Sequence, residues 1–328
     1  MTAEERILFA VARQDFLAVH RETVESAARG PVRWEDLAAT AESHGVAPIA
    51  GHNLRRCAIE MPAEVSGRLE RAFFENVLVK AQEAERLARA VGRLGAAGFQ
   101  VLLLKSAALE LGVYREPWVT TSKDSDLLLR PARSLAQDER ELRRTLYRSG
   151  IECDLDTHHD LDMHGVLPVR YERIWAAARP VDFHGAEAFV MAPEDLLLSL
   201  CVGACRKRFF RLKPLFDIAE TVGKGLDWDR FVERAREDHC EGIAWAALLA
   251  ASRTLGAAVP DVRDGALAGL GVSPVRGATI RRLVERGSLD APSALLPYAS
   301  YRWSQALRSV RIALTAEPPA HHRPPQAV

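Results

Sequence analysis

Two short apolar runs, each next to charged residues, constrain the fold of this chain more than any other feature. Residues 101–104 read Val-Leu-Leu-Leu and are followed by Lys105. Four apolar residues in a row suit a strand that is buried on both faces. Three leucines at 127–129 follow the sequence Asp-Ser-Asp. We therefore predict two buried strands in the middle of the chain, at 99–104 and 125–129.

The acids at the start of the second run suggest a cation site. Side chains alternate along a strand, so Asp124 and Asp126 would project to the same face. Two neighbouring carboxylates repel each other, which a plain core would avoid, whereas a divalent cation such as Mg²⁺ binds to carboxylate oxygens. The alternative is that Asp124 caps a turn after residues 120–123 and Asp126 lies on a solvated strand face.

The remaining sequence predicts helices on both sides of a mixed region. Residues 73–94 repeat apolar side chains with helical spacing, in the stripe Val77, Ala81, Ala84, Leu87, Val91 and Leu94. Residues 180–191 suggest a hairpin that turns at Gly185, and Pro193 and Asp227 each suggest a helix start. We expect a helical N-terminal segment at 1–97, a core at 98–192, a helical segment at 193–314 and a disordered tail at 315–328.

Composition excludes several classes of protein. Of the 328 residues, 48% are hydrophobic and 27% are charged, which is typical of a globular chain. Lys plus Arg and Asp plus Glu are both 44, so no net basic field favours nucleic acid. Five scattered cysteines argue against a disulfide framework. No secretory signal and no membrane-length apolar run is found, so we expect a cytoplasmic location.

An ordered set of motifs resembles a known family. The sequence Leu-Leu-Lys-Ser-Ala-Ala-Leu at 103–109, then Tyr114, then Asp-Ser-Asp-Leu-Leu-Leu at 124–129, is similar to the uncharacterised nucleotidyltransferase family of the polymerase-β-like superfamily. The likeness covers roughly residues 30 to 260. It extends to the stretches 34–37, 44–46, 179–181, 191–198 and 211–218.

The resemblance implies an α+β fold, in which a small mixed β-sheet core is flanked by N-terminal and C-terminal helical segments. It also implies Mg²⁺ or Mn²⁺ bound by Asp124 and Asp126. This chain departs from the family at two positions, with Ser106 where the family usually has Gly and Thr120 where it usually has Arg. The second departure removes a possible phosphate or substrate contact.

The family's third metal ligand lies in a strand that resembles residues 156–161 here. We therefore choose Asp156, which would hold the catalytic metal and favour deprotonation of the acceptor hydroxyl. Asp154 lies on the same face of the expected strand and is the second choice, and Asp162 and Asp182 are further alternatives. Reasoning from the residues alone does not separate these four acids.

Four further residues are candidates for substrate binding. Lys105 and Ser106 would lie in a loop that holds the triphosphate, although Lys105 would also suit a solvated strand end. His158 would position the acceptor or a phosphate, or would bond to a strand neighbour. Arg208 belongs to the basic run 206–213, which would contact phosphates or form a solvated face with Phe209, Phe210 and Leu212 buried.

The expected function is metal-dependent transfer of a nucleoside monophosphate from an NTP such as ATP. The acceptor would be a hydroxyl of an unknown small molecule, peptide or protein. The alternative is a catalytically silent relative of the same fold that binds a nucleotide or serves as a scaffold. Cys201 and Cys205 have helical spacing but lack further ligands nearby, so we predict no zinc site there.

Overall fold

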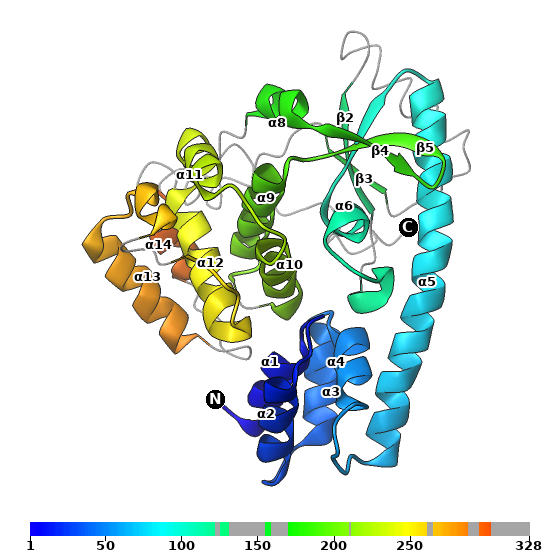
Figure 1. Ribbon diagram of the computed structural model, residues 1–328, viewed down its shortest axis with the longest axis vertical. Coiled ribbons are helices and arrows are strands. Elements are labelled where there is room, and N and C mark those ends of the chain that lie inside the picture. The colour runs from blue at the N-terminus through cyan, green and yellow to red at the C-terminus, as the bar shows by residue number, and fades with distance from the viewer. Residues whose placement is uncertain are drawn as a thin grey trace, which may run out of the picture.

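The structure, a computed structural model, describes residues 1–121, 125–130, 155–158, 170–209, 211–260, 265–287 and 295–302. It is an α+β protein in which a small mixed sheet lies beside two groups of helices (Figure 1). The fold class expected from the sequence is confirmed. The acids Asp124, Asp154 and Asp162 and the tail at 315–328 lie outside the described residues.

The sheet has five strands in the order β3-β2-β1-β5-β4. β1 runs antiparallel to β2 and parallel to β5, and β2 runs parallel to β3. β4 and β5 form the expected hairpin, in which Gly185 takes a φ of 85° that favours glycine. The strands span Gln100–Leu103 (β1), Ser125–Arg130 (β2), Leu155–His158 (β3), Arg179–Phe183 (β4) and Ala186–Val190 (β5).

The two central strands carry the apolar runs. Leu102, Leu103, Leu127 and Leu128 are all completely buried, as expected for a strand that is covered on both faces. The long helix α5 (Ala63–Ala96) packs on β1 and β5, and the short helix α6 (Lys105–Gly112) packs on β2. The first strand is shorter than the predicted range, because Phe99 and Leu104 flank it without joining it.

Helix α5 joins the two ends of the molecule, running from the N-terminal helices to the sheet (Figure 1). Its predicted apolar stripe is only partly correct. Leu87, Val91 and Leu94 are buried against the sheet, but Ala81 is exposed and Val77 is half-buried. The N-terminal helices are α1 (Ala3–Val11), α2 (Ala18–Ala28), α3 (Trp34–Ser43) and α4 (Ala47–Leu54).

Two polar residues of α5 are buried in place of the missing apolar ones. Asn76 donates to the carbonyl oxygens of Trp118 (2.7 Å) and Thr120 (3.2 Å). Lys80 pairs with Glu83 at 3.0 Å and with Glu110 at 3.1 Å. Buried polar groups are tolerated when they find such partners. A periodicity argument cannot anticipate this, because Glu110 and the carbonyl groups of Trp118 and Thr120 come from segments distant in sequence.

The C-terminal helices surround the fully buried middle of α12 (Glu241–Leu255), where Ile243, Ala246 and Leu248 contact no solvent. The helix starts expected at Pro193 and Asp227 are both confirmed, and Asp227 accepts a hydrogen bond from the Arg230 N–H at 3.0 Å. The other elements are η1 (Pro117–Val119), α8 (Tyr171–Ala177), α9 (Pro193–Arg206), α10 (Leu212–Val222), α11 (Trp228–Glu237), η2 (Ala266–Leu270), α13 (Pro274–Arg286) and α14 (Leu296–Ser300). None of the helices in the described part of the chain has the length and apolar character needed to cross a membrane.

Candidate active site at the start of strand β2

Asp126 lies at the start of β2, beside the end of β1. The antiparallel register pairs Leu103 with Leu127, and the Leu104 N–H donates to the Asp126 carbonyl oxygen at 3.0 Å. The side chain of Asp126 is only 3% exposed. The Lys105 ammonium group donates to its carboxylate. Burying a carboxylate is costly unless it is paired, so Lys105 provides the charge that Asp126 needs in this state.

Lys105 reaches Asp126 because the backbone turns sharply after β1. Lys105 is the first residue of α6, yet its φ is 45°, in the left-handed region that is unfavourable for a residue with a side chain. Such conformations are often found at functional sites, where the surrounding structure holds them. The Lys105 side chain is 48% exposed, whereas Ser106 behind it is buried. Lys105 is therefore not simply a solvated residue at the end of a strand, because its ammonium group pairs with the buried Asp126.

Asp156 is brought next to Asp126 by the pairing of β2 with β3. The two strands are parallel, and Asp126 and Asp156 are directly paired in their register. His158, two residues further along β3, is paired with Leu128. The backbone positions of Asp126 and Asp156 are described, while the side chains of Asp156 and His158 lie outside the described set. Sequence reasoning placed both acids on strands but did not establish that the strands are adjacent.

Asp182 is the one alternative third ligand that the described residues include, and its position rules it out. It lies on β4, and both β1 and β5 separate that strand from β2. Its side chain is exposed and accepts a hydrogen bond from the Gly185 N–H at 3.1 Å, which stabilises the hairpin turn. Within the described residues, no three His, Cys, Asp or Glu side chains are placed to hold a metal ion.

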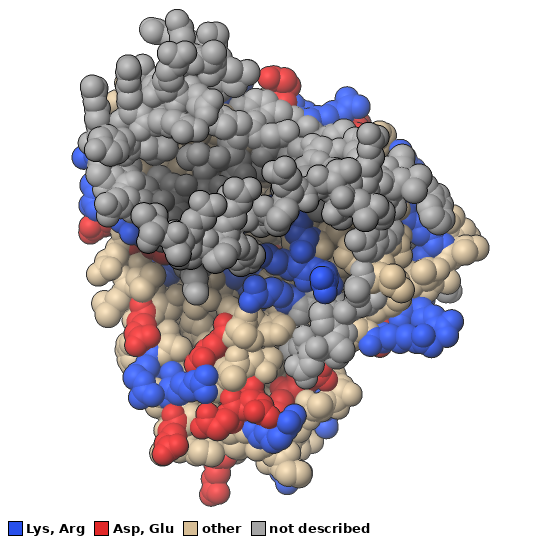
Figure 2. Space-filling model, turned by 180° about the vertical axis from the view of Figure 1, so that it is seen from behind, with Lys and Arg blue, Asp and Glu red and all other residues tan. Residues whose placement is uncertain are grey.

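The basic run follows α9 in an unusual helix end. Arg208 has a φ of 58°, at the position after the C-cap where glycine is usual, and Phe209 behind it is fully buried. Arg208 and Phe209 N–H groups donate back to Cys205 and Ala204, closing the last turn. The burial expected for Phe209 and Leu212 is confirmed, and Arg208 is exposed. Figure 2 shows Lys and Arg side chains gathered near the middle of one face of the molecule.

Two other members of the basic run already have protein partners. The Arg211 guanidinium donates to the Ser43 carbonyl oxygen, and the Lys213 ammonium pairs with Asp217 at 2.9 Å. These two side chains attach the start of α10 to the N-terminal helices and to its own second turn. The contact of the basic run with phosphates stays a prediction, because Asp124 lies outside the described residues.

Thr120 belongs to a buried polar network that sequence reasoning missed. The Tyr114 hydroxyl donates to Asp217 and lies 3.3 Å from the Thr120 hydroxyl. Burial, together with the charge of Asp217, raises the pKa of Tyr114 well above its ordinary value. The network attaches the chain just before residues 124–126 to α10. The sequence signal that could have indicated this network is an isolated acid, Asp217, within the apolar pattern Leu-Phe-Asp-Ile.

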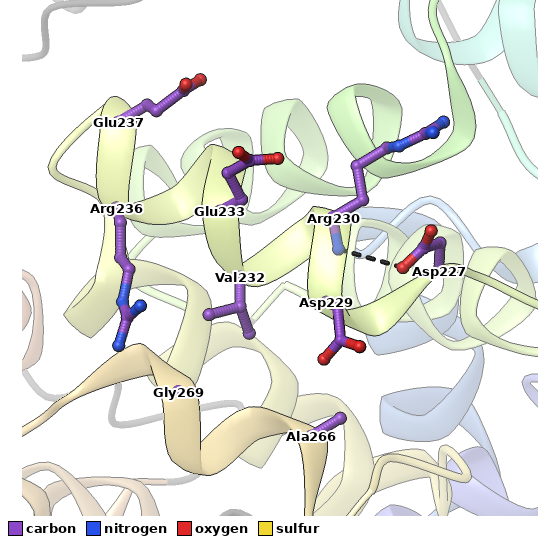
Figure 3. A pocket seen from close by; sticks show the side chains of 9 residues that line it. All are labelled: Asp227, Asp229, Arg230, Val232, Glu233, Arg236, Glu237, Ala266 and Gly269. Carbon is purple, nitrogen blue, oxygen red and sulfur yellow. Dashed lines mark hydrogen bonds between the residues drawn. The ribbon is translucent and has the colours of Figure 1, made fainter.

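Two hollows on the surface lie away from these residues. One, of about 770 Å³, is bounded by α11 and η2, where Asp229, Val232 and Arg236 point toward the Ala266–Gly269 segment (Figure 3). The other, of about 870 Å³, lies between α5, η1 and the β4–β5 turn. None of the site residues predicted from the sequence lines either hollow, so neither is the candidate active site.

The buried cysteines behave as core residues. Cys201 and Cys205 are fully buried on α9, and burial raises the pKa of Cys205 to about 12. A thiol with a raised pKa stays protonated near neutral pH, and the protonated form is a poor metal ligand and nucleophile.

Comparison with known protein families identifies the family of this chain. The model of a family described as uncharacterised nucleotidyltransferase matches residues 30–256, which is more than half of the chain. The chain belongs to this family. The resemblance drawn from the sequence is thus confirmed over nearly the same residues. Searches of curated proteins and of solved structures found no significant match.

The match encloses every part of the candidate site. Asp126, Asp156, Lys105 and the Tyr114–Asp217 network of this family member all lie between residues 30 and 256. The helices α13 and α14 lie beyond the matched region.

Proposed function

We propose that this protein transfers a nucleoside monophosphate from an NTP to a hydroxyl group of a small molecule, peptide or protein. In this proposal Asp124, Asp126 and Asp156 hold Mg²⁺ or Mn²⁺. The observation that supports it most is the pairing of Asp126 with Asp156 in adjacent parallel strands, within a chain of the nucleotidyltransferase family. Two acids at neighbouring positions of a rigid sheet are a stable platform for a charged ligand.

The donor atoms near Asp126 fit a hard divalent cation. Asp126 offers carboxylate oxygens from a buried position, and its present partner is the cation of Lys105. Carboxylate oxygens are preferred ligands of Mg²⁺, which usually retains substrate phosphates and waters as well. When bound, Mg²⁺ would supply Lewis-acid stabilisation of the charge on the phosphate oxygens.

The reaction leaves the protein mainly with positioning and charge compensation. The acceptor oxygen attacks the α-phosphorus, the bond from that phosphorus to the bridging oxygen breaks, and pyrophosphate leaves. The acceptor proton passes to the Asp156 carboxylate and then to solvent. The exposed stem of Lys105 allows its ammonium group to turn from Asp126 to the phosphates, beside the N–H groups that begin α6.

Three other residues complete the proposed site. Ser106 follows Lys105 at the start of α6 and would support the phosphate-binding turn. His158 lies on β3 two residues after Asp156 and would orient the acceptor. Arg208 is exposed at the end of α9 and would compensate the charge of the leaving pyrophosphate.

The direct test uses each NTP labelled at the α-phosphate, with Mg²⁺ or Mn²⁺ and a metabolite extract. We expect label in a new product that is absent without divalent metal. The same incubation with NTP labelled at the γ-phosphate should leave label only in unreacted NTP, in pyrophosphate and in the breakdown products of pyrophosphate. Label transferred from the γ-position would indicate a phosphotransferase instead. Mg²⁺-dependent NTP binding without any transfer would favour the silent relative.

One observation favours that second candidate, a nucleotide-binding protein without turnover. The position where the family usually has an arginine is occupied by Thr120, whose side chain is buried and faces the Tyr114 hydroxyl. Thr120 therefore offers no cation to a phosphate. The acids at 126 and 156 are both present, which is why we place transfer first.

Replacing Lys105 should separate its two proposed roles. We expect Lys105→Met to lower the transfer rate by about 10²-fold, because a cation beside the phosphates is lost. The same change should increase the rise in melting temperature caused by Mg²⁺ without NTP, because Lys105 no longer competes for Asp126. Lys224→Met, at an exposed lysine after α10, is the matched control and should change neither quantity. A smaller Mg²⁺ effect in Lys105→Met would contradict this competition.

The third carboxylate can be identified by a paired substitution. We expect Asp156→Asn to abolish detectable transfer, because Asp156 is the register partner of Asp126. Asp154 lies before the first residue of β3, and Asp154→Asn should retain most of the activity. Both rates are measured with the α-labelled NTP. The reverse outcome would move the third ligand to Asp154 and leave the reaction class unchanged.

A further inference from the structure

The middle of α5 exposes large apolar side chains to solvent. Phe74 is 54% exposed and Leu78 is 65% exposed, and Ala81 one turn later is exposed as well. With 3.6 residues per turn, these positions form one stripe along the helix. Figure 1 shows α5 along an edge of the molecule. Contiguous exposed apolar side chains on an otherwise amphipathic helix are typical of an interaction surface.

Two charges on this stripe lie at equal distances from Leu78. Arg71 lies seven residues before it and Glu85 seven residues after it, on the same helical stripe. Both side chains are exposed. Glu85 lies 3.4 Å from Arg89, and an exposed ion pair of this kind contributes little stability and can exchange partners. Arg71 thus has an acidic counterpart at the same distance on the other side of Leu78.

This symmetry fits a second copy of the same helix in the antiparallel direction. With a two-fold axis at Leu78, Arg71 would face the partner's Glu85. A two-fold interface uses the same patch on both subunits, so one sequence must carry both halves of every charged pair. Leu78 would meet the partner's Leu78, and the small Ala81 would allow the helix backbones to approach.

We propose that α5 mediates homodimerisation through an antiparallel helix pair centred at Leu78. The contacting stretch from Arg71 to Glu85 is about 21 Å long at 1.5 Å per residue. This is small beside a standard interface, so the dimer should dissociate on dilution. The surface excludes Asp126, Asp156 and Lys105, so the inference does not depend on the proposed reaction.

Other exposed apolar residues lack this pattern and provide controls. Val275 is 79% exposed at the start of α13, and α13 has no second large apolar side chain exposed beside it in the described residues. Arg276 and Arg281 after it find no acidic counterpart at the same distance before it, where the chain has Pro274 and Gly269. A substitution at Val275 therefore tests for general effects of exposed apolar residues.

Sedimentation velocity of the full chain over a range of concentrations tests the proposal. We expect a concentration-dependent species of twice the 36.2-kDa chain mass. Leu78→Glu should leave only monomer, while Val275→Glu should behave as the wild type. Leu78 is exposed, so its replacement should not affect folding, which circular dichroism can verify. A wild-type protein that stays monomeric at every concentration, or a dimer that survives Leu78→Glu, would overturn the proposal.

A charge exchange tests the antiparallel direction. Arg71→Glu should weaken the dimer by about tenfold, because two Arg–Glu contacts become repulsive. The double variant Arg71→Glu/Glu85→Arg should restore wild-type association. Leu78→Cys should crosslink efficiently under mild oxidation, since the two-fold axis brings the introduced thiols together, whereas Val275→Cys should not. Failure of the double variant to recover, combined with no crosslink at position 78, would exclude this geometry.

Discussion

Asp126→Asn should lower the nucleotidyl transfer rate by about 10³-fold or more, which is the scale expected when a charged group that stabilises the transition state is lost. The asparagine keeps the shape of the buried side chain and removes its charge. Lys105 loses its partner, but its side chain is half exposed and can be solvated, so the penalty for folding should be small. The rate is measured with the α-labelled NTP, and the fold by circular dichroism.

A control on the same sheet makes this result specific. Asp182→Asn removes an exposed acid from β4, which is separated from β2 by two strands, and should retain transfer within about twofold. The rise in melting temperature caused by Mg²⁺ provides a readout that does not need activity. This rise should vanish in Asp126→Asn and persist in Asp182→Asn. Equal loss of transfer in both variants would indicate a structural effect.

The sequence was sufficient to locate Asp126 but not to find its neighbours. The apolar runs at 101–104 and 127–129 leave little choice except buried strands, and their ends mark Lys105 and Asp126. The pairing of those two side chains depends on antiparallel register, and the pairing with Asp156 depends on a parallel strand about thirty residues away. Local periodicity carries no information about either pairing.

The error of the sequence reasoning about α5 has a tertiary cause. Ala81 was expected in the core of α5, yet Lys80 is buried instead, because Glu83 and Glu110 neutralise it. The partner Glu110 on α6 overrides local preference, since a buried polar group with good partners costs little. These interactions could be found only when the three-dimensional arrangement was known.

The second large effect should come from an ion cluster that joins α8 to the C-terminal helices. Arg173 of α8 donates to Asp195 of α9 at 3.0 Å. It also donates to Asp238, just after α11, at 2.6 and 2.7 Å, and to Glu237 at 2.9 Å. The Asp195 side chain is only 1% exposed. The guanidinium group of Arg173 therefore pairs with two deeply buried carboxylates, those of Asp195 and Asp238, and with the partly exposed carboxylate of Glu237.

Arg173→Met should lower the free energy of unfolding by about 3–5 kcal/mol, because the buried Asp238 loses Arg173 and the buried Asp195 keeps Arg234 at the longer distance of 3.8 Å. Methionine keeps the apolar stem of arginine, so lost packing contributes little. Arg253→Met is the matched control. It breaks a 2.8 Å pair with Glu285 in which both side chains are exposed, and should cost no more than about 1 kcal/mol. Urea unfolding at pH 7 measures both effects.

The pH dependence of this destabilisation follows from the pKa of Asp195. Burial raises the pKa of that carboxyl even in the wild type, although Arg173 and Arg234 oppose the effect. Without Arg173 the pKa should rise further, so the folded state would bind a proton more readily than the unfolded state. The destabilisation is then fully present above the folded pKa and is relieved as the pH falls below it. We therefore expect the difference between Arg173→Met and wild type to shrink as the pH is lowered from 7 toward the unfolded pKa of aspartate. A difference that stays constant over this range would show that lost packing, and not uncompensated charge, accounts for the effect.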